Sequence, residues 1–476
     1  MEGLQAEFAE IYGVFCGARA SVTAICPGGT PSFVYRRLAE MAGGECLLED
    51  DIAQSGVSPR ETAAYLAELG EEYAAVALGL GDAYYQIADG ISFHHGTVSN
   101  ENIRGIYGEK LRLSASQIDR LAECRMRYFL QHGLRVRERK PVAVDPAEYG
   151  TYVHDILEET AREVMEKGGF KKLSVHETLE IARGHSARYV SKHFSELESQ
   201  RISYLLSRNS QELDMVVEEL WEELHNCAFV PADFEVHFGA DGKMPPVAIF
   251  SRSLEAELEG YVDRVDIWKK DGRNYFRVVD YKTGKKDFDY CDVFNGVGLQ
   301  MLLYLFALAR GGVELLGENT YPAGVLYFPA RAPVMATDGA LSAEEAKKLR
   351  VDEWKRKGLI LDDLDILNAM QPKEGLQKLD CRVNKEGKLT GAVASREQFR
   401  QLEKYITQLL SQMVDTISSG NVEANPYTRG NNHNACSFCP YHQICRPEQV
   451  EGRRDYSTMS SADFWERIER SVRTDA

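Results

Sequence analysis

Two aspartates and a lysine, Asp263, Asp280 and Lys282, lie in two stretches of alternating residues that the dipeptide Asp271-Gly272 separates. Asp-Gly between such stretches is the strongest short-range signal for a two-residue β-hairpin turn. If these two residues form the turn, Asp263 lies directly opposite Asp280 across the hairpin. The Cβ atoms of opposed residues are about 4.5–5.5 Å apart. The hairpin therefore predicts a pair of adjacent carboxylates.

Opposed carboxylates repel each other and destabilise a hairpin unless a cation lies between them. A hard divalent cation, Mg²⁺ or Mn²⁺, is the ion that oxygen ligands suit best. Lys282 lies two residues beyond Asp280 and so on the same face of the strand, where its ammonium can orient water or stabilise charge on a phosphate. This is the chemistry of phosphodiester hydrolysis. The alternative is a solvent-facing hairpin of alternating charges, which the apolar Val278-Val279 before Asp280 disfavours.

The next carboxylate along, Asp266, is expected to pair with Arg264 or another basic group rather than to join the site.

Three cysteines, Cys436, Cys439 and Cys445, are close enough in sequence to bind a metal together. They need a fourth ligand, and from the spacing alone either His433 or His442 could complete a zinc site. The other cysteines are scattered and are expected to be small core residues or, in one case, a distant ligand.

Bulk composition limits the possible functions. The net charge of −17 argues against a protein that coats nucleic acid over its whole surface, but permits one that holds DNA in a local basic channel. The basic residues between Arg125 and Lys140 could form such a channel or a solvated face. No apolar run is long enough to span a membrane, and the N-terminus lacks a secretory signal, so we expect a cytoplasmic protein. The sequence contains no Gly-x4-Gly-Lys-Ser/Thr phosphate loop, and therefore no ATP-binding motor of that type.

The periodicity of apolar residues predicts the elements that position these groups. Residues 246–282 and 322–329 have strand character, and residues 170–228 are polar and helical. Helices are predicted to begin near Ser114, with Gln117 in a capping box, and at Asp145-Pro146, passing His154 and ending at Gly168-Gly169. Further helices are expected at residues 295–310, from Ser342, and at 395–420. On the helix at 295–310, Gln300 and Tyr304 are four residues apart and share a face.

Several motifs occur in a characteristic order over residues 110–447: Ser114 to Cys124, Gly150-Thr151-Tyr152-Val153-His154, Phe234-Glu235 with Phe238-Gly239, Asp263, Asp280 with Lys282, Gln300-x3-Tyr304, and Cys436-x2-Cys439-x5-Cys445. In this order they resemble the RecB-type branch of the PD-(D/E)XK nucleases, and within it the AddB-type subunits of bacterial helicase–nuclease complexes. The resemblance implies an α/β fold with a PD-(D/E)XK core, a central mixed sheet flanked by helices, together with helical insertions.

The resemblance also implies roles for individual residues. His154, Asp263, Asp280 and the backbone carbonyl of Tyr281 would ligate Mg²⁺ or Mn²⁺, with Lys282 catalytic. Gln300 and Tyr304 would position DNA. Cys124 would be the fourth ligand of a [4Fe–4S] cluster with Cys436, Cys439 and Cys445; structural zinc is the alternative.

The expected function is exonuclease-type processing of single-stranded DNA ends in double-strand-break repair and recombination, beside a partner subunit of AddA type. Two alternatives are a catalytically idle DNA-binding or scaffolding module of such a complex and a CRISPR-associated nuclease of the same branch.

The predicted organisation has three parts. Residues 1–110 form a small α/β piece that could be a remnant of a helicase-like subdomain. Residues 111–450 form the nuclease domain, which the cysteine cluster closes as a clasp. Residues 451–476 form a charged C-terminal tail that is expected to dock loosely.

Overall fold

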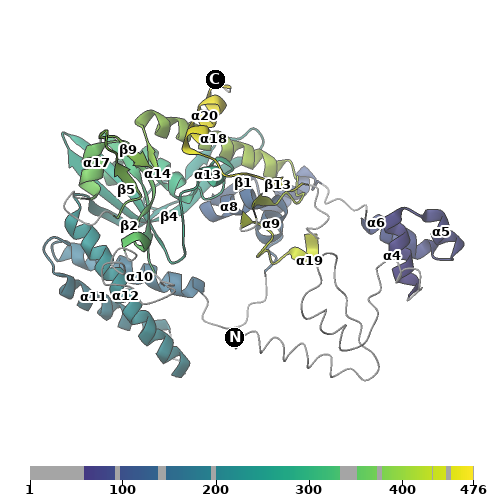
Figure 1. The fold of residues 1–476 in the computed structure, drawn as a ribbon, viewed down its shortest axis with the longest axis horizontal. Coiled ribbons are helices and arrows are strands. Elements are labelled where there is room, and N and C mark those ends of the chain that lie inside the picture. The colour runs from purple at the N-terminus through teal and green to yellow at the C-terminus, as the bar shows by residue number, and fades with distance from the viewer. Residues whose placement is uncertain are drawn as a thin grey trace. The chain divides into compact units, whose positions relative to one another are not determined.

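The computed structural model describes residues 58–91, 97–137, 146–193, 200–332, 351–371, 378–430, 433–445 and 452–474 (Figure 1). The chain separates into two compact units, residues 1–94 and 95–476. The described part of the first unit consists of three short helices, α4 (Pro59–Leu69), α5 (Glu72–Ala77) and α6 (Gly81–Ile91). Residues 1–57 of the predicted N-terminal α/β piece lie outside the described residues, as does the start of the helix predicted from Ser342. Helix α7 (Asn100–Tyr107) belongs to the second unit, so this unit begins before residue 110, where we had divided the chain.

A mixed, eight-stranded sheet forms the centre of the second unit, and its main path runs β1-β4-β5-β6-β7-β10. Strands β2 and β3 also pair with β4, both antiparallel. The β4–β5 and β6–β7 pairs are antiparallel, whereas β1–β4, β5–β6 and β7–β10 are parallel. This confirms the predicted α/β fold with a mixed central sheet. The strands are β1 (Lys110–Ser114), β2 (Val230–Phe238), β3 (Val247–Ile249), β4 (Glu255–Lys270), β5 (Arg273–Lys282), β6 (Thr320–Pro329), β7 (Lys357–Leu361) and β10 (Val393–Ala394).

The β4–β5 hairpin has the predicted turn and register. Asp271 and Gly272 both have positive φ, 51° and 72°, as a type I′ turn requires. Lys270 pairs with Arg273, and the ladder continues without a shift to Arg264 opposite Val279. The turn therefore fixes which residues face each other at the far end of the hairpin.

Helices cover both faces of the sheet. In Figure 1, α10 (Pro146–Glu166), α11 (Val175–His193) and α12 (Gln200–Asn226) lie together below it, and α18 (Arg396–Ser418) and α20 (Ser461–Thr474) lie above it. Helix α14 (Gln300–Gly311) packs on β5 and β6, and almost all of its apolar residues are buried. The remaining helices are α8 (Ala115–Glu123), α9 (Arg125–Tyr128), the π-helix η1 (Phe129–Gly133), α13 (Tyr290–Phe294), α15 (Val313–Leu316), α17 (Leu364–Met370) and α19 (His442–Cys445).

Two helix starts follow from capping boxes in the sequence. The Ser114 side chain accepts from the backbone N–H of Gln117, whose side chain accepts from the Ser114 N–H. Ser395 and Gln398 make the same reciprocal pair at the start of α18. These bonds satisfy backbone donors that a helix otherwise leaves unpaired, so both starts agree with the prediction.

The C-terminal segment does not dock loosely, and that prediction was wrong. Phe464 and Ile468, on one face of α20, have no exposed surface and belong to the main hydrophobic core. The ring of Phe464 lies 5.0 Å from that of Tyr290 on α13. The abundant charges of this segment lie on the other face of an amphipathic helix, and they masked its apolar stripe in the sequence.

Small strands complete the second unit: β8 (Cys381–Val383) with β9 (Leu389–Gly391), and a three-stranded sheet of β12 (His433–Asn434), β11 (Tyr427–Arg429) and β13 (Arg454–Asp455). Among the described helices, none combines the length and apolar character needed to cross a membrane.

Candidate active site

The two aspartates of the hairpin lie one step beyond the last regular pair of the β4–β5 ladder. Arg264 opposes Val279, so the same register places Asp263 opposite Asp280. Both side chains are buried, with 8% and 1% of their surface exposed. Oδ2 of Asp263 accepts a 2.8 Å hydrogen bond from the backbone N–H of Tyr281. The orientation of the Asp263 carboxylate is therefore set by the β5 backbone.

His154 reaches the same place from α10. Its Nε2 donates to the carbonyl oxygen of Tyr281 at 2.8 Å, so the proton of the neutral ring is on Nε2 and the lone pair is on Nδ1. Nδ1 lies 3.4 Å from Oδ2 of Asp263. Burial lowers the pKa of His154 and so favours this neutral form. A lone pair directed at a carboxylate is the arrangement that a cation between the two atoms would stabilise.

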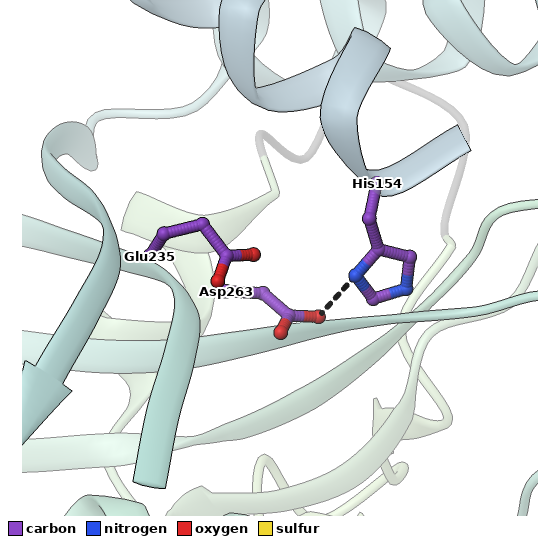
Figure 2. A group of neighbouring side chains, drawn as sticks. All are labelled: His154, Glu235 and Asp263. Atoms are coloured by element: carbon purple, nitrogen blue, oxygen red, sulfur yellow. Dashed lines mark ion pairs between the residues drawn. The ribbon is translucent and has the colours of Figure 1, made fainter. Parts of the chain in front are cut away.

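A third carboxylate, Glu235 on β2, belongs to this group and was missed in the sequence. One ligand atom each from His154, Glu235 and Asp263 lie within 4.8 Å of one another, and no other group of three or more potential ligands among the described residues is this close. Figure 2 shows the Glu235 carboxylate directed at Asp263, with the imidazole on the other side. We had treated Phe234-Glu235 only as a structural signature. No tight turn joins β2 to β4, so a register that places Glu235 cannot be read from the sequence.

Burial and mutual repulsion disfavour the ionised forms of these carboxylates. Burial, followed by the charge of Asp280, raises the pKa of Asp263 to about 8. Burial and then Asp263 raise the pKa of Glu235 to about 7, and burial raises that of Asp280. Oδ1 of Asp280 is buried without a hydrogen-bond partner. Oxygen ligands, one imidazole and an excess of buried negative charge suit a divalent cation such as Mg²⁺ or Mn²⁺.

Lys282 lies beside the acidic residues on the face expected from its spacing. Its Nζ is 2.5 Å from Oδ2 of Asp280 and donates to Oε1 of Gln300 at 3.1 Å. Nε2 of Gln300 in turn donates to the hydroxyl of Tyr304 at 3.2 Å, so the two residues share a face of α14 as expected. Tyr304 is only 6% exposed. Gln300 of α14 thus contacts Lys282 directly, whereas Tyr304 contacts Gln300 and is linked to the lysine only through it.

A network of buried charges lies on the opposite face of the hairpin. Asp266 pairs with Nε of Arg264 at 3.0 Å, the partner expected from the sequence, and with Nε of Arg277 at 2.8 Å. Glu223 of α12 contacts both guanidinium groups, at 2.6 and 2.7 Å. Such a network fixes the two strands relative to α12, because removing one partner would leave a buried charge unpaired.

The four cysteines Cys124, Cys436, Cys439 and Cys445 line one pocket. Cys124 lies in extended conformation at the junction of α8 and α9, rather than within a helix. Burial and the neighbouring thiols raise the pKa of Cys445 to about 11, with Cys439, Cys124 and Cys436 all contributing. Arg454 donates to the carbonyl oxygen of Ala122 at the end of α8, so the C-terminal segment also holds this region.

Of the two alternative histidine ligands, only His442 can be placed relative to the cysteines. His442 is exposed and does not line the pocket, and the side chain of His433 lies outside the described residues.

The basic run beside Cys124 is partly neutralised. Arg127 pairs with Glu123 at 2.9 Å, and Arg125 lies 3.6 Å from Glu423. Arg139 and Lys140 lie outside the described residues, so the channel interpretation stays a prediction.

The sequence model of the PD-(D/E)XK nuclease superfamily matches residues 112–446. Two similar proteins are each named as a subunit of an ATP-dependent helicase/deoxyribonuclease. The one from Moorella thermoacetica is 36% identical over 376 residues, which are 77% of this chain and 33% of the relative. The one from Clostridium novyi is 33% identical over 358 residues, 73% of this chain and 31% of the relative. The chain thus spans about a third of the length of these relatives.

Proposed function

This chain belongs to the PD-(D/E)XK nuclease superfamily, and on that basis we propose that it is a metal-dependent deoxyribonuclease that processes DNA ends. The observation that carries the proposal is the buried pair Asp263 and Asp280 with Lys282 beside it. Two opposed carboxylates in an apolar environment are costly without a cation. A buried site that contains both carboxylates and a lysine is better explained by hydrolysis of a phosphodiester than by a purely structural role.

In this proposal Mg²⁺ or Mn²⁺ would be held by His154, the carboxylates of Asp263 and Asp280, and the carbonyl oxygen of Tyr281, which would first have to give up its hydrogen bond with Nε2 of His154. When bound, such an ion supplies Lewis-acid stabilisation of phosphoryl oxygen and acidifies water. The remaining chemistry belongs to the chain itself. Lys282 places a positive charge beside the phosphate, where negative charge grows during hydrolysis. Gln300 holds the lysine at 3.1 Å, and Tyr304 holds Gln300.

We further propose that Cys124, Cys436, Cys439 and Cys445 hold a [4Fe–4S] cluster. Its role would be structural, because nuclease chemistry requires no electron transfer. Cys124 lies at the start of the nuclease unit and the other three ligands near its end, so the cluster would connect segments that are far apart in sequence. Closing so long a loop constrains the unfolded chain as a disulfide does. Structural zinc is the alternative that metal analysis would identify.

The names of the relatives suggest the setting of this activity. As part of a helicase–nuclease, the site would act on single-stranded DNA ends in double-strand-break repair and recombination, beside a partner subunit of AddA type. The net charge of −17 suits a protein that receives DNA from a partner better than one that captures it alone.

The proposal is tested with anaerobically purified protein and single-stranded DNA labelled at one end. Cleavage is expected with Mg²⁺ or Mn²⁺ and not with EDTA. Mononucleotides released from one end would indicate an exonuclease, and internal fragments an endonuclease. Metal-dependent binding of DNA without any cleavage, alone or with a partner subunit, would favour the catalytically idle module instead.

A further inference from the structure

The start of helix α14 is held by a side chain of α8. Oδ1 of Asp119 accepts hydrogen bonds from the backbone N–H groups of Gly298 at 3.0 Å and Leu299 at 3.3 Å. Because α14 begins at Gln300, these two bonds fix the backbone directly before the helix. A carboxylate at this end of a helix also interacts favourably with the helix dipole. Asp119 therefore caps a helix that begins about 180 residues later in the sequence.

The segment before α14 does not provide such a cap itself. Leu299 is the N-cap residue, and its side chain makes no capping hydrogen bond. Gly296 and Gly298 have positive φ, 84° and 71°. Glycine adopts these conformations freely, so the segment has many alternatives to the one observed. The bonds to Asp119 therefore help to select a single conformation at the start of α14.

Helix α8 is a suitable support because it is held at both of its ends. The capping box of Ser114 and Gln117 fixes its start. At its end, Arg454 donates to the carbonyl oxygen of Ala122. Ile118, next to Asp119, has no exposed surface. The carboxylate of Asp119 thus projects from a helix whose position the surrounding core determines.

The first residue of α14 contacts the lysine of the candidate active site. Oε1 of Gln300 accepts from Nζ of Lys282 at 3.1 Å, and the same Nζ lies 2.5 Å from Oδ2 of Asp280. If the first turn of α14 moved, Gln300 would move with it. Lys282 would then lose one of the two contacts that position its ammonium group. A continuous series of contacts therefore connects Asp119 to Lys282 through the start of α14.

We propose that Asp119 is a positioning residue for hydrolysis, because it anchors the first turn of α14 and so lets Gln300 hold the ammonium of Lys282 beside the acidic residues. Asp119 acts through Gln300 and not by contact with the metal or the DNA. This inference rests on the proposed nuclease function and adds to it a residue from outside the acidic site.

The test compares cleavage of end-labelled single-stranded DNA by the parent protein, Asp119→Ala and Asp119→Asn, all prepared without oxygen. The assays are run with saturating Mg²⁺ at pH 8, where Asp119 is ionised, because burial raises the pKa of this carboxyl to about 6. Asp119→Ala removes the acceptor and is expected to lower kcat about tenfold, the rate equivalent of one ordinary hydrogen bond, with KM for DNA unchanged. Asp119→Asn keeps an oxygen that can accept both bonds, and should stay within about twofold of the parental kcat.

Asp363→Ala is the matched control for the loss of a helix cap. Oδ1 of Asp363 accepts from the backbone N–H groups of Asp365 at 2.9 Å and Ile366 at 3.4 Å, at the start of α17. This variant should lower the melting temperature as Asp119→Ala does, but keep the parental kcat. Hydrogen exchange at residues 298–300 should become faster in Asp119→Ala and stay unchanged in Asp363→Ala.

A double variant with Gln300→Ala tests the route. If Asp119 acts through Gln300, Asp119→Ala should cause no further loss of kcat in the Gln300→Ala protein, because the two residues then affect rate through one interaction. If Asp119 only supports the fold, the two losses should multiply.

The outcomes separate this inference from the function on which it rests. A parent protein that cleaves DNA, together with an Asp119→Ala protein of parental kcat or with losses that multiply in the double variant, overturns the positioning role and leaves the nuclease function intact. A parent protein that does not cleave DNA overturns both. Should Asp119→Ala unfold, as judged by its thermal melt, Asp119→Leu takes its place, since leucine has a similar shape and no acceptor. A parental kcat in that variant would equally contradict the proposal.

Discussion

The backbone N–H of Tyr281 donates a 2.8 Å hydrogen bond to Oδ2 of Asp263, from the strand opposite. The carbonyl oxygen of the same residue accepts from Nε2 of His154. One peptide segment of β5 therefore orients two of the proposed metal ligands, and it does so through backbone atoms. Side-chain substitutions at Asp280 and Lys282 should leave these two ligands in place.

We predict that Asp280→Ala abolishes Mg²⁺-dependent cleavage while the protein stays folded. The variant removes a ligand but also relieves a buried carboxylate whose pKa burial raises, so the metal-free protein should lose no stability. End-labelled DNA and a thermal melt measure the two effects. Cleavage at the parental rate by this variant would rule out the catalytic assignment.

Lys282→Ala is expected to slow cleavage by roughly two to three orders of magnitude, the scale of losing one donor to a developing anion. Metal binding should be retained, because Lys282 is not a ligand. Lys285→Ala is the matched control, since Lys285 is exposed and lies 3.3 Å from Glu353. Equal effects of the two substitutions would show that only overall charge matters.

Lys286 is expected to contact the DNA backbone near the site. Its Nζ lies 3.3 Å from where a Cβ on Gly298 would be, just before α14, and its charge acts on Asp280. Lys286→Ala should weaken DNA binding. It should also make the slope of log Kd against log salt concentration shallower by about one unit. Fluorescence anisotropy with the cleavage-deficient Asp280→Ala protein measures both. The same slope in the Lys286→Ala and Lys285→Ala proteins would contradict this placement.

Metal binding should release protons at neutral pH. With pKa values of about 8 for Asp263 and about 7 for Glu235, both carboxyls are partly protonated at pH 7 and must ionise to bind a cation. Calorimetric titrations in buffers of different ionisation enthalpy count these protons, and the count should fall toward zero by pH 9. A release independent of pH from 6 to 9 would be inconsistent with these carboxyls as ligands.

The same pKa values predict how stability changes with pH in the metal-free protein. Both carboxyls bind protons more tightly in the folded chain, whereas their ordinary values are 3.8 and 4.5. Their contribution is therefore fully present below about pH 4 and lost as the pH rises through about 8. Glu235→Gln removes one of them, so its melting temperature should fall less steeply between pH 5 and 8 than that of the parent.

Cys124→Ser is predicted to yield a protein without the cluster's visible absorbance and with a lower melting temperature. It should also lose protection of residues 433–445 from protease, because ligation contributes to folding where the unfolded chain has no site. Nuclease activity should fall through loss of structure rather than of metal ligands. Parent and variant are prepared without oxygen and compared by absorbance, iron content and melt. A full iron complement with an unchanged melt would exclude Cys124 as the fourth ligand.

Contacts of the C-terminal segment should limit how far Cys124→Ser destabilises the protein. Arg454 donates to the end of α8, and Phe464 and Ile468 are buried in the main core. These contacts hold the cysteine region to the nuclease core without any cluster. We therefore expect Cys124→Ser to loosen the region around α19 and not to unfold the sheet.

Features that depend on neighbouring residues could be predicted from the amino-acid sequence. Asp271-Gly272 specified a turn with two positive φ values, and that turn fixed the register that brings Asp263 opposite Asp280. Ser114 and Ser395 specified two helix starts through bonds to residues three positions later. The four cysteines were grouped by resemblance to a family, and the fold brings them to one pocket.

The roles of Glu235 and of the C-terminal helix emerged from the folded chain alone. Glu235 faces Asp263 because β2 pairs with β4, and no short turn connects these strands to encode their register. The tail is buried because Phe464 meets Tyr290, which is distant in sequence, while its charges face away. Interactions between residues close in sequence are specified by the types and spacing of those residues. A contact between distant segments depends on how the whole core packs, and this packing cannot be read from a short stretch of sequence.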